Sequence, residues 1–419
     1  MKNESKLNKK AKFFIIIGVV AVIAVMVAVI LTGCNGKDDD YDDDGNDKKG
    51  GVIDILDKSE ASEKKNPVPE NHDEDACGEN LTWSYDDAYE TITISGNGEM
   101  WDYIYKENGS NYYSEADTPW DNCEFDTIVI EDGVEKIGDY AFTKCYKLYY
   151  LTLPDTIKSI GDYAFDNCYF IQKLNLPEGV TEIGKNAFSH CTSLTEIKIP
   201  ASVKRIGENA FFGCDSRFIN DIELSENVEY IGLSAFDGMK IQNIEIAEGN
   251  KYYSDIDGIL FNKDKTEIIF YPGKRNAKTY EIPSGVKKIN DYAFHNASWL
   301  EKIEIPDGVT EIGDYAFNVA LKDIELPDSI KTIGEGAFSG TQNSEFIIPE
   351  GVENVGNYAF SWCKQLKKIT IPASVKSIGG NVFFSTELEE IHFGGTKSQW
   401  EALGIDSDTI QGVNIIFGK

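Results

Sequence analysis

The chain has 419 residues, with 71 Asp and Glu against 40 Lys and Arg, a net charge of −31 at pH 7, and 41% hydrophobic residues. This length fits two or three ordinary domains or one long repeat array with a large core. The acidic balance argues against binding to DNA or RNA, whose phosphates require Lys and Arg. It fits basic proteins or divalent cations as partners, or serves solubility alone. We predict no metal site and no cofactor, because no two histidines stand at a metal-ligand spacing among His72, His190, His295 and His392.

The N-terminus, residues 1–34, predicts export and a membrane tether. Lysines are concentrated in the first twelve residues, and an apolar run of nineteen residues follows from Phe13 to Leu31. This order is typical of an export signal and leaves the rest of the chain outside the cell membrane. The run ends in Leu31-Thr32-Gly33-Cys34, which resembles the lipobox of bacterial lipoproteins and implies lipid attachment at Cys34. An uncleaved signal anchor is the alternative, since nineteen apolar residues are long enough to span a bilayer.

Residues 35–76 have the composition of a disordered acidic stalk. They carry fifteen acidic and six basic residues and few apolar ones, so they lack the surface needed to offset the entropy of ordering. Asp40, Asp42 and Asp44 match the opening of a calcium-binding loop. Gly51 stands where the bidentate Glu of such a loop belongs, so we predict a solvated charge run and not a calcium site.

One template, V/I-x-x-I-G-x-x-A-F, recurs along the rest of the chain. Its Phe-to-Phe spacings are 23, 23, 23, 25, 58, 23, 21, 22 and 23 residues. Such spacing is the signature of stacked repeats, because no single unit can bury its own apolar face. The ten copies end at Phe142, Phe165, Phe188, Phe211, Phe236, Phe294, Phe317, Phe338, Phe360 and Phe383.

A short alternating run precedes most copies and usually ends in proline, as in Ile197-Lys198-Ile199-Pro200 and Ile303-Glu304-Ile305-Pro306. Alternation predicts a strand with one buried face, and proline ends it because it cannot donate to the ladder. A second apolar stretch, a glycine and the A-F turn complete each repeat. We therefore expect a mainly β fold with a parallel sheet and one coil every ~23 residues.

Three repeat positions have predicted roles. The glycine is expected to adopt a backbone conformation closed to larger residues, and the phenylalanine to fill the interior of the coil. Five cysteines fall three residues after the phenylalanine, where other copies carry Met, Ala or Thr. We predict a column of small buried side chains there and not a metal site. These cysteines are Cys145, Cys168, Cys191, Cys214 and Cys363.

The repeat, with its strand, proline and cysteine positions, resembles the BspA-type leucine-rich repeats of bacterial surface proteins over about residues 77–419. The resemblance implies a leucine-rich-repeat solenoid with an array at 128–393. The Cys77–Trp83 run and the Thr91–Gly96 run look like the family's N-terminal cap unit, here 77–127. Gly394–Trp400 looks like its C-terminal cap, here 394–419. In that cap, Thr396 and Gln399 predict a capping box for a short helix, followed by a last strand near 413–417.

The 58-residue spacing marks an insertion at about 247–282. Asp257-Gly258 and Lys263-Asp264-Lys265 between apolar runs predict an inserted hairpin. Two interpretations stay open. The insertion is either an irregular rung of the solenoid or a protruding contact surface with exposed tyrosines.

The middle residue of each predicted ladder strand must point outward, and five in succession are glutamates. Parallel stacking would place them ~4.8 Å apart, where like charges repel. Such a row predicts a groove for a basic partner or for cations. Alternatively, Glu is simply common in this chain, and Lys302 and Lys322 relieve the repulsion. The candidate ligand-binding residues are Glu223, Glu245, Glu281, Glu304 and Glu325.

Cys77 and Cys123 lie off the cysteine column and could form a disulfide, which an exported location permits. No catalytic motif is present, so no enzyme is predicted. The family resemblance implies a cell-surface binding or adhesion protein with extracellular protein or glycan partners. A non-catalytic envelope scaffold is the alternative.

Overall fold

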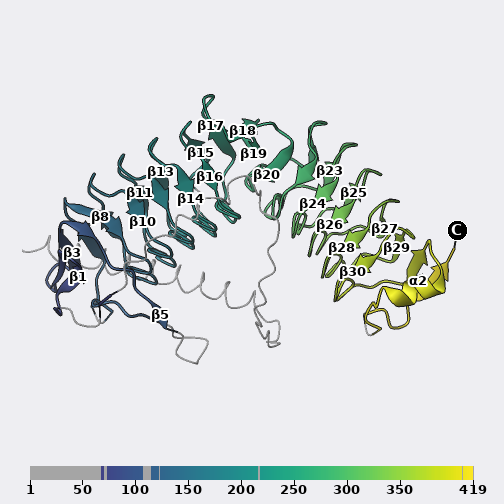
Figure 1. The fold of residues 1–419 in the computed structure, drawn as a ribbon, viewed down its shortest axis with the longest axis horizontal. Coiled ribbons are helices and arrows are strands. Elements are labelled where there is room, and N and C mark those ends of the chain that lie inside the picture. Colours follow the sequence, from purple (N-terminus) through teal and green to yellow (C-terminus); the bar gives the residue numbers. More distant parts are fainter. Residues whose placement is uncertain are drawn as a thin grey trace, which may run out of the picture. The chain divides into compact units, whose positions relative to one another are not determined.

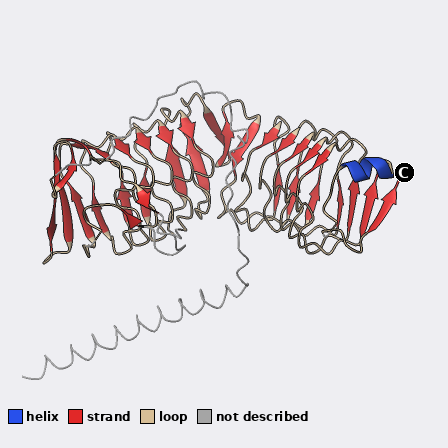
Figure 2. Cartoon of the chain, turned by 60° about the horizontal axis from the view of Figure 1, so that its bottom comes forward, coloured by secondary structure: helices blue, strands red, loops and turns tan. Residues whose placement is uncertain are grey.

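The computed structural model describes residues 68–69, 73–106, 115–121, 123–215, 218–407 and 409–418. Cys34, the predicted export signal and most of the predicted stalk lie outside these residues. The described chain is built almost wholly from short strands and turns, and its one helix is α2, Lys397–Ala402 (blue in Figure 2). Nothing in the described ranges has the length and apolarity of a membrane-spanning helix.

Each repeat contributes one strand to a first row of parallel strands, which Figure 1 shows side by side along the chain. Residues alternate along these strands, with Ile222 and Leu224 buried and Glu223 exposed in β15. The predicted alternating strands are thus confirmed. The first row comprises β7 (Thr127–Ile130), β9 (Tyr150–Thr152), β11 (Lys173–Asn175), β13 (Glu196–Lys198), β15 (Asp221–Leu224), β17 (Asn243–Ile246), β21 (Thr279–Glu281), β23 (Lys302–Glu304), β25 (Asp323–Glu325), β27 (Glu345–Ile347), β29 (Lys368–Ile371), β31 (Glu390–Phe393) and β32 (Asn414–Phe417).

The V-x-x-I stretch forms a second row of parallel strands, so each coil has two ladders. The second row keeps the repeat register, since Ile160 pairs with Ile137 on one side and Ile183 on the other. It comprises β4 (Gly98–Glu99), β8 (Val134–Ile137), β10 (Ser159–Ile160), β12 (Glu182–Ile183), β14 (Arg205–Ile206), β16 (Tyr230–Ile231), β22 (Lys288–Ile289), β24 (Glu311–Ile312), β26 (Thr332–Ile333), β28 (Asn354–Val355) and β30 (Ser377–Ile378).

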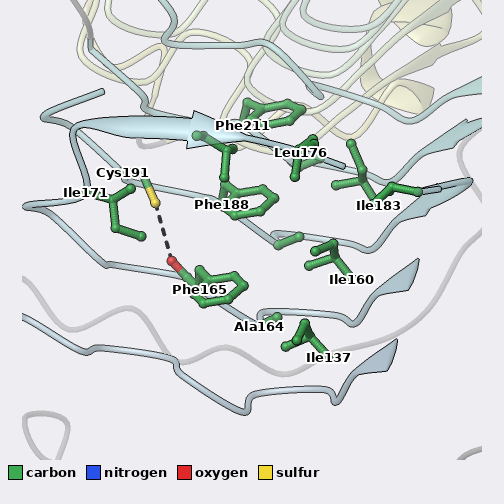
Figure 3. Packing of buried hydrophobic residues seen from close by; sticks show 14 of the residues in the cluster. Ile137, Ile160, Ala164, Phe165, Ile171, Leu176, Ile183, Phe188, Cys191 and Phe211 are labelled. Carbon is green, nitrogen blue, oxygen red and sulfur yellow. Dashed lines mark hydrogen bonds between the residues drawn. The ribbon is translucent and has the colours of Figure 1, made fainter. Parts of the chain in front are cut away.

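The repeat phenylalanines form buried columns of stacked rings inside the coils, one from Phe142 to Phe236 before the insertion and one from Phe294 to Phe383 after it. Phe165 and Phe188 stack at 5.3 Å with an interplanar angle of 3°, and Phe188 and Phe211 at 5.6 Å (Figure 3). Each fully buried ring contributes about 2–3 kcal/mol through the area it removes from water. Trp120 extends the column at its N-terminal end, 5.0 Å from Phe142, although it is not part of the repeat template.

The cysteine column is confirmed as a packing position. Cys168, Cys191, Cys214 and Cys363 are buried, and Cys145 at the N-terminal end is half-buried. Each buried thiol donates to the backbone carbonyl of the column phenylalanine in the previous coil, as Cys191 Sγ does to Phe165 O at 3.4 Å (Figure 3). Burial raises the pKa of the Cys363 thiol, which keeps it protonated. In the described part of the chain, no group of three metal-ligating side chains occurs.

The prediction that the repeat glycine is needed for its backbone conformation was wrong. Gly161, Gly184 and Gly207 do not adopt left-handed backbone angles. Instead, a Cβ on Gly184 would lie 2.6 Å from the backbone carbon of Gly161, so the glycine is needed because adjacent coils approach closely. The left-handed residue stands two positions later, for example Tyr163 at φ 56° and Asn186 at φ 52°.

Acidic side chains that follow the repeat-glycine position accept hydrogen bonds from the backbone of the next coil. Asp291 Oδ1 accepts from the backbone N–H of Asp314 at 2.8 Å, and Asp314 Oδ1 accepts from that of Glu335 at 2.7 Å. Asn357 does the same without a charge, accepting from Gly380 N at 2.9 Å. Desolvation raises the pKa of the Asp314 carboxyl, and the neighbouring charge of Glu335 adds to the rise.

Asp314→Asn is therefore expected to raise the melting temperature near neutral pH by about 1–2 °C. The pKa of Asp314 is higher in the folded state, so its contribution to stability is present below the unfolded pKa and is lost as pH rises through the folded pKa. Asparagine keeps the acceptor without that loss. Circular dichroism melts at pH 7.5 and pH 4 check this. The gain should vanish at pH 4, and exposed Asp328→Asn should show neither effect. A lower melting temperature at pH 7.5 would contradict the argument.

The insertion contains the hairpin that the Asp257-Gly258 turn predicted, and a third antiparallel strand extends it. Its strands are β18 (Tyr253–Ile256), β19 (Ile259–Asn262) and β20 (Glu267–Phe270). Asp257 and Gly258 both have positive φ, 51° and 75°, as a two-residue hairpin turn requires. Strand β20 then pairs in parallel with β22, so the insertion rejoins the second row.

The insertion is an irregular rung and not a protruding contact surface. Leu260 packs into the core on the N-terminal side, while Ile259 and Phe261 pack into the core on the C-terminal side. Tyr271 stands in the ring column, 5.2 Å from Phe294, and donates its N–H to Ala293 O as the column phenylalanines do. The alternative interpretation, a protruding surface with exposed tyrosines, is thus wrong. Tyr271 and Tyr253 are buried, and Tyr252 is 36% exposed.

A buried carboxylate also joins the coils on either side of the insertion. Asp237 follows column residue Phe236, and both its oxygens accept from the rung after the insertion. His295 Nδ1 lies 2.8 Å from Asp237 Oδ2, and Asn296 Nδ2 donates to Oδ1. The contact replaces part of the backbone ladder that links regular coils.

Both ends of the solenoid are capped. At the N-terminal end β1 (Ala76–Gly78), β2 (Leu81–Asp86) and β3 (Thr91–Gly96) are antiparallel, and β3 pairs in parallel with β7. A small hairpin, β5 (Tyr105–Lys106) and β6 (Glu115–Ala116), follows. At the C-terminal end the capping box of α2 is confirmed, with Thr396 Oγ1 accepting from Gln399 N at 3.3 Å and Trp400 buried against Phe393.

Cys77 and Cys123 are free thiols, so the disulfide that they could form is not present in this structure. Cys77 is fully buried in the core, and burial raises its pKa to about 12. Cys123 is half-buried and lies near Tyr85. The N-terminal cap is held instead by packing, with Trp83 edge-on to Trp120 at 6.0 Å.

Candidate functional site

The outward face of the first row is the candidate site, because it displays the predicted glutamates in register. Glu223 pairs with Glu245 across β15 and β17. Glu304 pairs with Glu281 on one side and Glu325 on the other, across β21, β23 and β25. All five side chains are exposed. We name these five residues the glutamate row.

The glutamate row is divided, and the prediction of five consecutive neighbours was wrong. The inserted hairpin occupies the free edge of β17, where Ile244 N donates to Gly258 O at 2.8 Å and Ile246 N to Asp255 Oδ1 at 3.1 Å. Glu245 and Glu281 therefore lie in separate sheets. Two acidic clusters result, one of two carboxylates and one of three.

Charge repulsion within the larger cluster is relieved on one side. Lys302 Nζ lies 3.6 Å from Glu304 and 3.4 Å from Asp323, and these carboxylates raise the pKa of Lys302. The prediction for Lys322 differs from the structure, because its ion pair at 3.2 Å is with Glu301, outside the row. Such exposed pairs contribute little to stability and leave most of the acidic field in place.

At the middle position of the first-row strands the acidity is confined to the central rungs, although Glu196 and Glu345 are also exposed on this face outside those rungs. On the N-terminal side the same register carries Thr152, Asn175 and Lys198, and Lys198 is paired with Glu178 at 2.8 Å. On the C-terminal side it carries Ile347, Thr370 and His392, with Ile347 68% exposed. Along the solenoid this position thus changes from polar to acidic residues, and then to one exposed isoleucine followed by Thr370 and His392.

Four exposed aromatic side chains stand on two consecutive coils near the N-terminal end of the array, and two of them, Tyr146 and Tyr169, stack on each other. The repeat spacing did not predict these side chains, because it picks out only the positions that recur. Tyr146 and Tyr169 lie four residues after their column phenylalanines, Phe170 five residues after, and Tyr150 begins strand β9. We name Tyr146, Tyr150, Tyr169 and Phe170 the aromatic patch. The next repeat carries Thr192 and Ser193 at the positions of Tyr169 and Phe170. This change between polar and aromatic residues is the signal that could have revealed the patch.

The fold and its repeat define a leucine-rich-repeat solenoid. A family model described as the BspA type leucine rich repeat region matches residues 117–221, 215–284, 267–320 and 287–402. The chain belongs to this family, which confirms the resemblance drawn from the repeat. The repeat family and this fold are typically non-catalytic. A search of the curated proteins found no match.

Several solved structures share the fold. A leucine-rich repeat protein from Eubacterium ventriosum is 23% identical, with a TM-score of 0.64 over 81% of this chain and 94% of that one. A leucine rich cell surface protein from Faecalibacterium prausnitzii is 27% identical, with a TM-score of 0.61 over 80% and 98%. The pneumococcal vaccine antigen PcpA is 22% identical, with a TM-score of 0.59 over 82% and 98%.

Proposed function

We propose that this chain is a cell-surface binding protein that presents the outward face of its first row to extracellular protein or glycan partners. The observation that carries the proposal is the glutamate row, two clusters of exposed carboxylates that are each held in register on adjacent strands. Like charges so placed are destabilising, so they favour a role in recognition. The net charge of −31 favours basic partners and speeds their association.

Two further observations support a surface location. The family's proteins are generally found at cell surfaces, and the 27% identical structure from Faecalibacterium prausnitzii is a cell surface protein. The sequence itself predicts export, with lipid attachment at Cys34 as the membrane tether. Mass spectrometry of the membrane-extracted protein tests the tether, since an intact Met1 end would contradict cleavage before Cys34.

Neutralising one member of each acidic cluster is expected to weaken binding to a basic partner. Glu245→Gln with Glu304→Gln should lower affinity about tenfold at low salt, and the difference should shrink as salt screens the exposed charges. Binding of the full chain to immobilised basic matrix proteins, measured at 50 and 300 mM NaCl, checks this.

The matched control is Glu229→Gln with Glu311→Gln, which removes the same charge from exposed positions outside the glutamate row. If both double variants lose affinity equally, net charge alone attracts the partner, and the glutamate row is not the binding site. If no matrix protein or glycan binds at any salt, the second candidate function, a non-catalytic envelope scaffold, is favoured.

A further inference from the structure

The aromatic patch exposes more ring surface than the repeat requires. Tyr150 is 59% exposed, Phe170 52%, Tyr146 48% and Tyr169 37%. Thr192 and Ser193 occupy the equivalent positions of the next coil, so the fold is built equally well with small polar residues there. Exposed apolar clusters on a folded protein mark interaction sites, because they otherwise lower solubility.

Contacts with neighbouring side chains orient three of the four rings. Tyr146 and Tyr169 stack at 5.5 Å with an interplanar angle of 17°, and Tyr150 meets Tyr149 edge-on at 4.6 Å. The Tyr169 hydroxyl donates to Asn167 Oδ1 at 2.8 Å. Such rings offer contact area at a low entropy cost on binding, as tyrosines do in antibody binding sites.

Cations already lie over other surface rings of this chain. The Arg205 guanidinium is 4.6 Å from the ring centre of Tyr230, and the Lys364 ammonium is 5.8 Å from that of Trp362. Within the described residues, no Lys or Arg is found over Tyr150, Tyr169 or Phe170.

Two lysines beside the patch, Lys147 and Lys173, are paired with carboxylates. Lys147 Nζ lies 2.5 Å from Glu124, which is 81% exposed, and Lys173 Nζ lies 3.5 Å from Glu196 on the adjoining strands. Open ring faces with exposed carboxylates beside them suit a cation that comes from another molecule.

We propose that the aromatic patch is a docking surface for a basic segment of an extracellular protein, whose Arg and Lys side chains lie over its rings. The inference rests on the proposed function and names where a basic partner makes its short-range contacts. The net charge of −31 and the glutamate row attract the partner, and the patch holds its cationic groups.

The test compares variants that keep net charge and an apolar side chain at each position but differ in aromaticity. Tyr150→Leu with Phe170→Leu removes two ring faces, whereas Tyr150→Phe with Phe170→Tyr keeps them. The probe is a fluorescent peptide of four Arg-Gly repeats, with a citrulline-Gly counterpart of equal shape and no charge. We expect the leucine variant of the full chain to bind the arginine peptide about five- to tenfold more weakly at 150 mM NaCl. We expect the aromatic-exchange variant to bind as the parent does, and the citrulline peptide not to bind.

Other outcomes overturn the inference and separate it from the proposed function. If the leucine variant binds normally while Glu245→Gln with Glu304→Gln weakens binding, the glutamate row acts alone. If the leucine variant loses the citrulline peptide or a neutral oligosaccharide to the same extent, the patch takes an uncharged partner. If the parent chain does not bind the arginine peptide, the patch is no site for cations.

Discussion

Phe317→Ala is expected to lower the free energy of unfolding by about 3–5 kcal/mol. Phe317 is fully buried between Phe294 at 5.2 Å and Phe338 at 5.6 Å. Its removal costs the transfer free energy of the ring and leaves a cavity that the neighbouring coils cannot close, because their backbones are held by two ladders. Urea unfolding followed by circular dichroism measures the change.

The same substitution at an exposed ring is the control. Phe218→Ala removes a ring that is 71% exposed, so its effect should stay within about 0.5 kcal/mol. Because each coil contacts only its neighbours, hydrogen exchange in Phe317→Ala should speed up most in the coils of Phe294 and Phe338. Equal losses of stability in Phe317→Ala and Phe218→Ala would mean that the buried rings do not stabilise the core more than an exposed ring does.

Gly184→Ala is expected to destabilise the solenoid by about 3 kcal/mol although it adds a single methyl group. The new Cβ would lie 2.6 Å from the Gly161 carbonyl carbon and 2.7 Å from Asp162 N, and both are backbone atoms that cannot rotate away. Relieving the clash would stretch the ladder bond from Gly184 N to Ile160 O, now 2.8 Å. Thermal and urea unfolding measure the loss.

Gly285→Ala is the matched control for this substitution. Its Cβ would meet only Lys265 O at 3.9 Å, and its φ is not left-handed. We expect a gain of about 0.4–1 kcal/mol, because alanine reduces the entropy of the unfolded chain. If Gly184→Ala also proved neutral, close approach of the coils would not explain the repeat glycine.

The sequence by itself determined the coil length, the alternating strand and the second apolar stretch of each repeat, the ring and cysteine columns, and the capping box at Thr396 and Gln399; only the structure showed that the second stretch is also a strand. These features depend on local spacing, and stacking applies the same spacing at every coil. Residues that share a repeat position must then share a column, so the burial of Phe165 or Cys191 follows from pattern alone.

Only the tertiary structure decided the features that depend on how particular backbones approach one another. The spacing could not show that the inserted hairpin would cover the edge of β17 and divide the glutamate row. It could not show that Tyr271 would enter the ring column, or that close backbones, rather than φ, would require Gly184. The aromatic patch was hidden for the same reason. A repeat reveals the positions that recur, whereas this surface is made by side chains that depart from the repeat and meet only when coils stack.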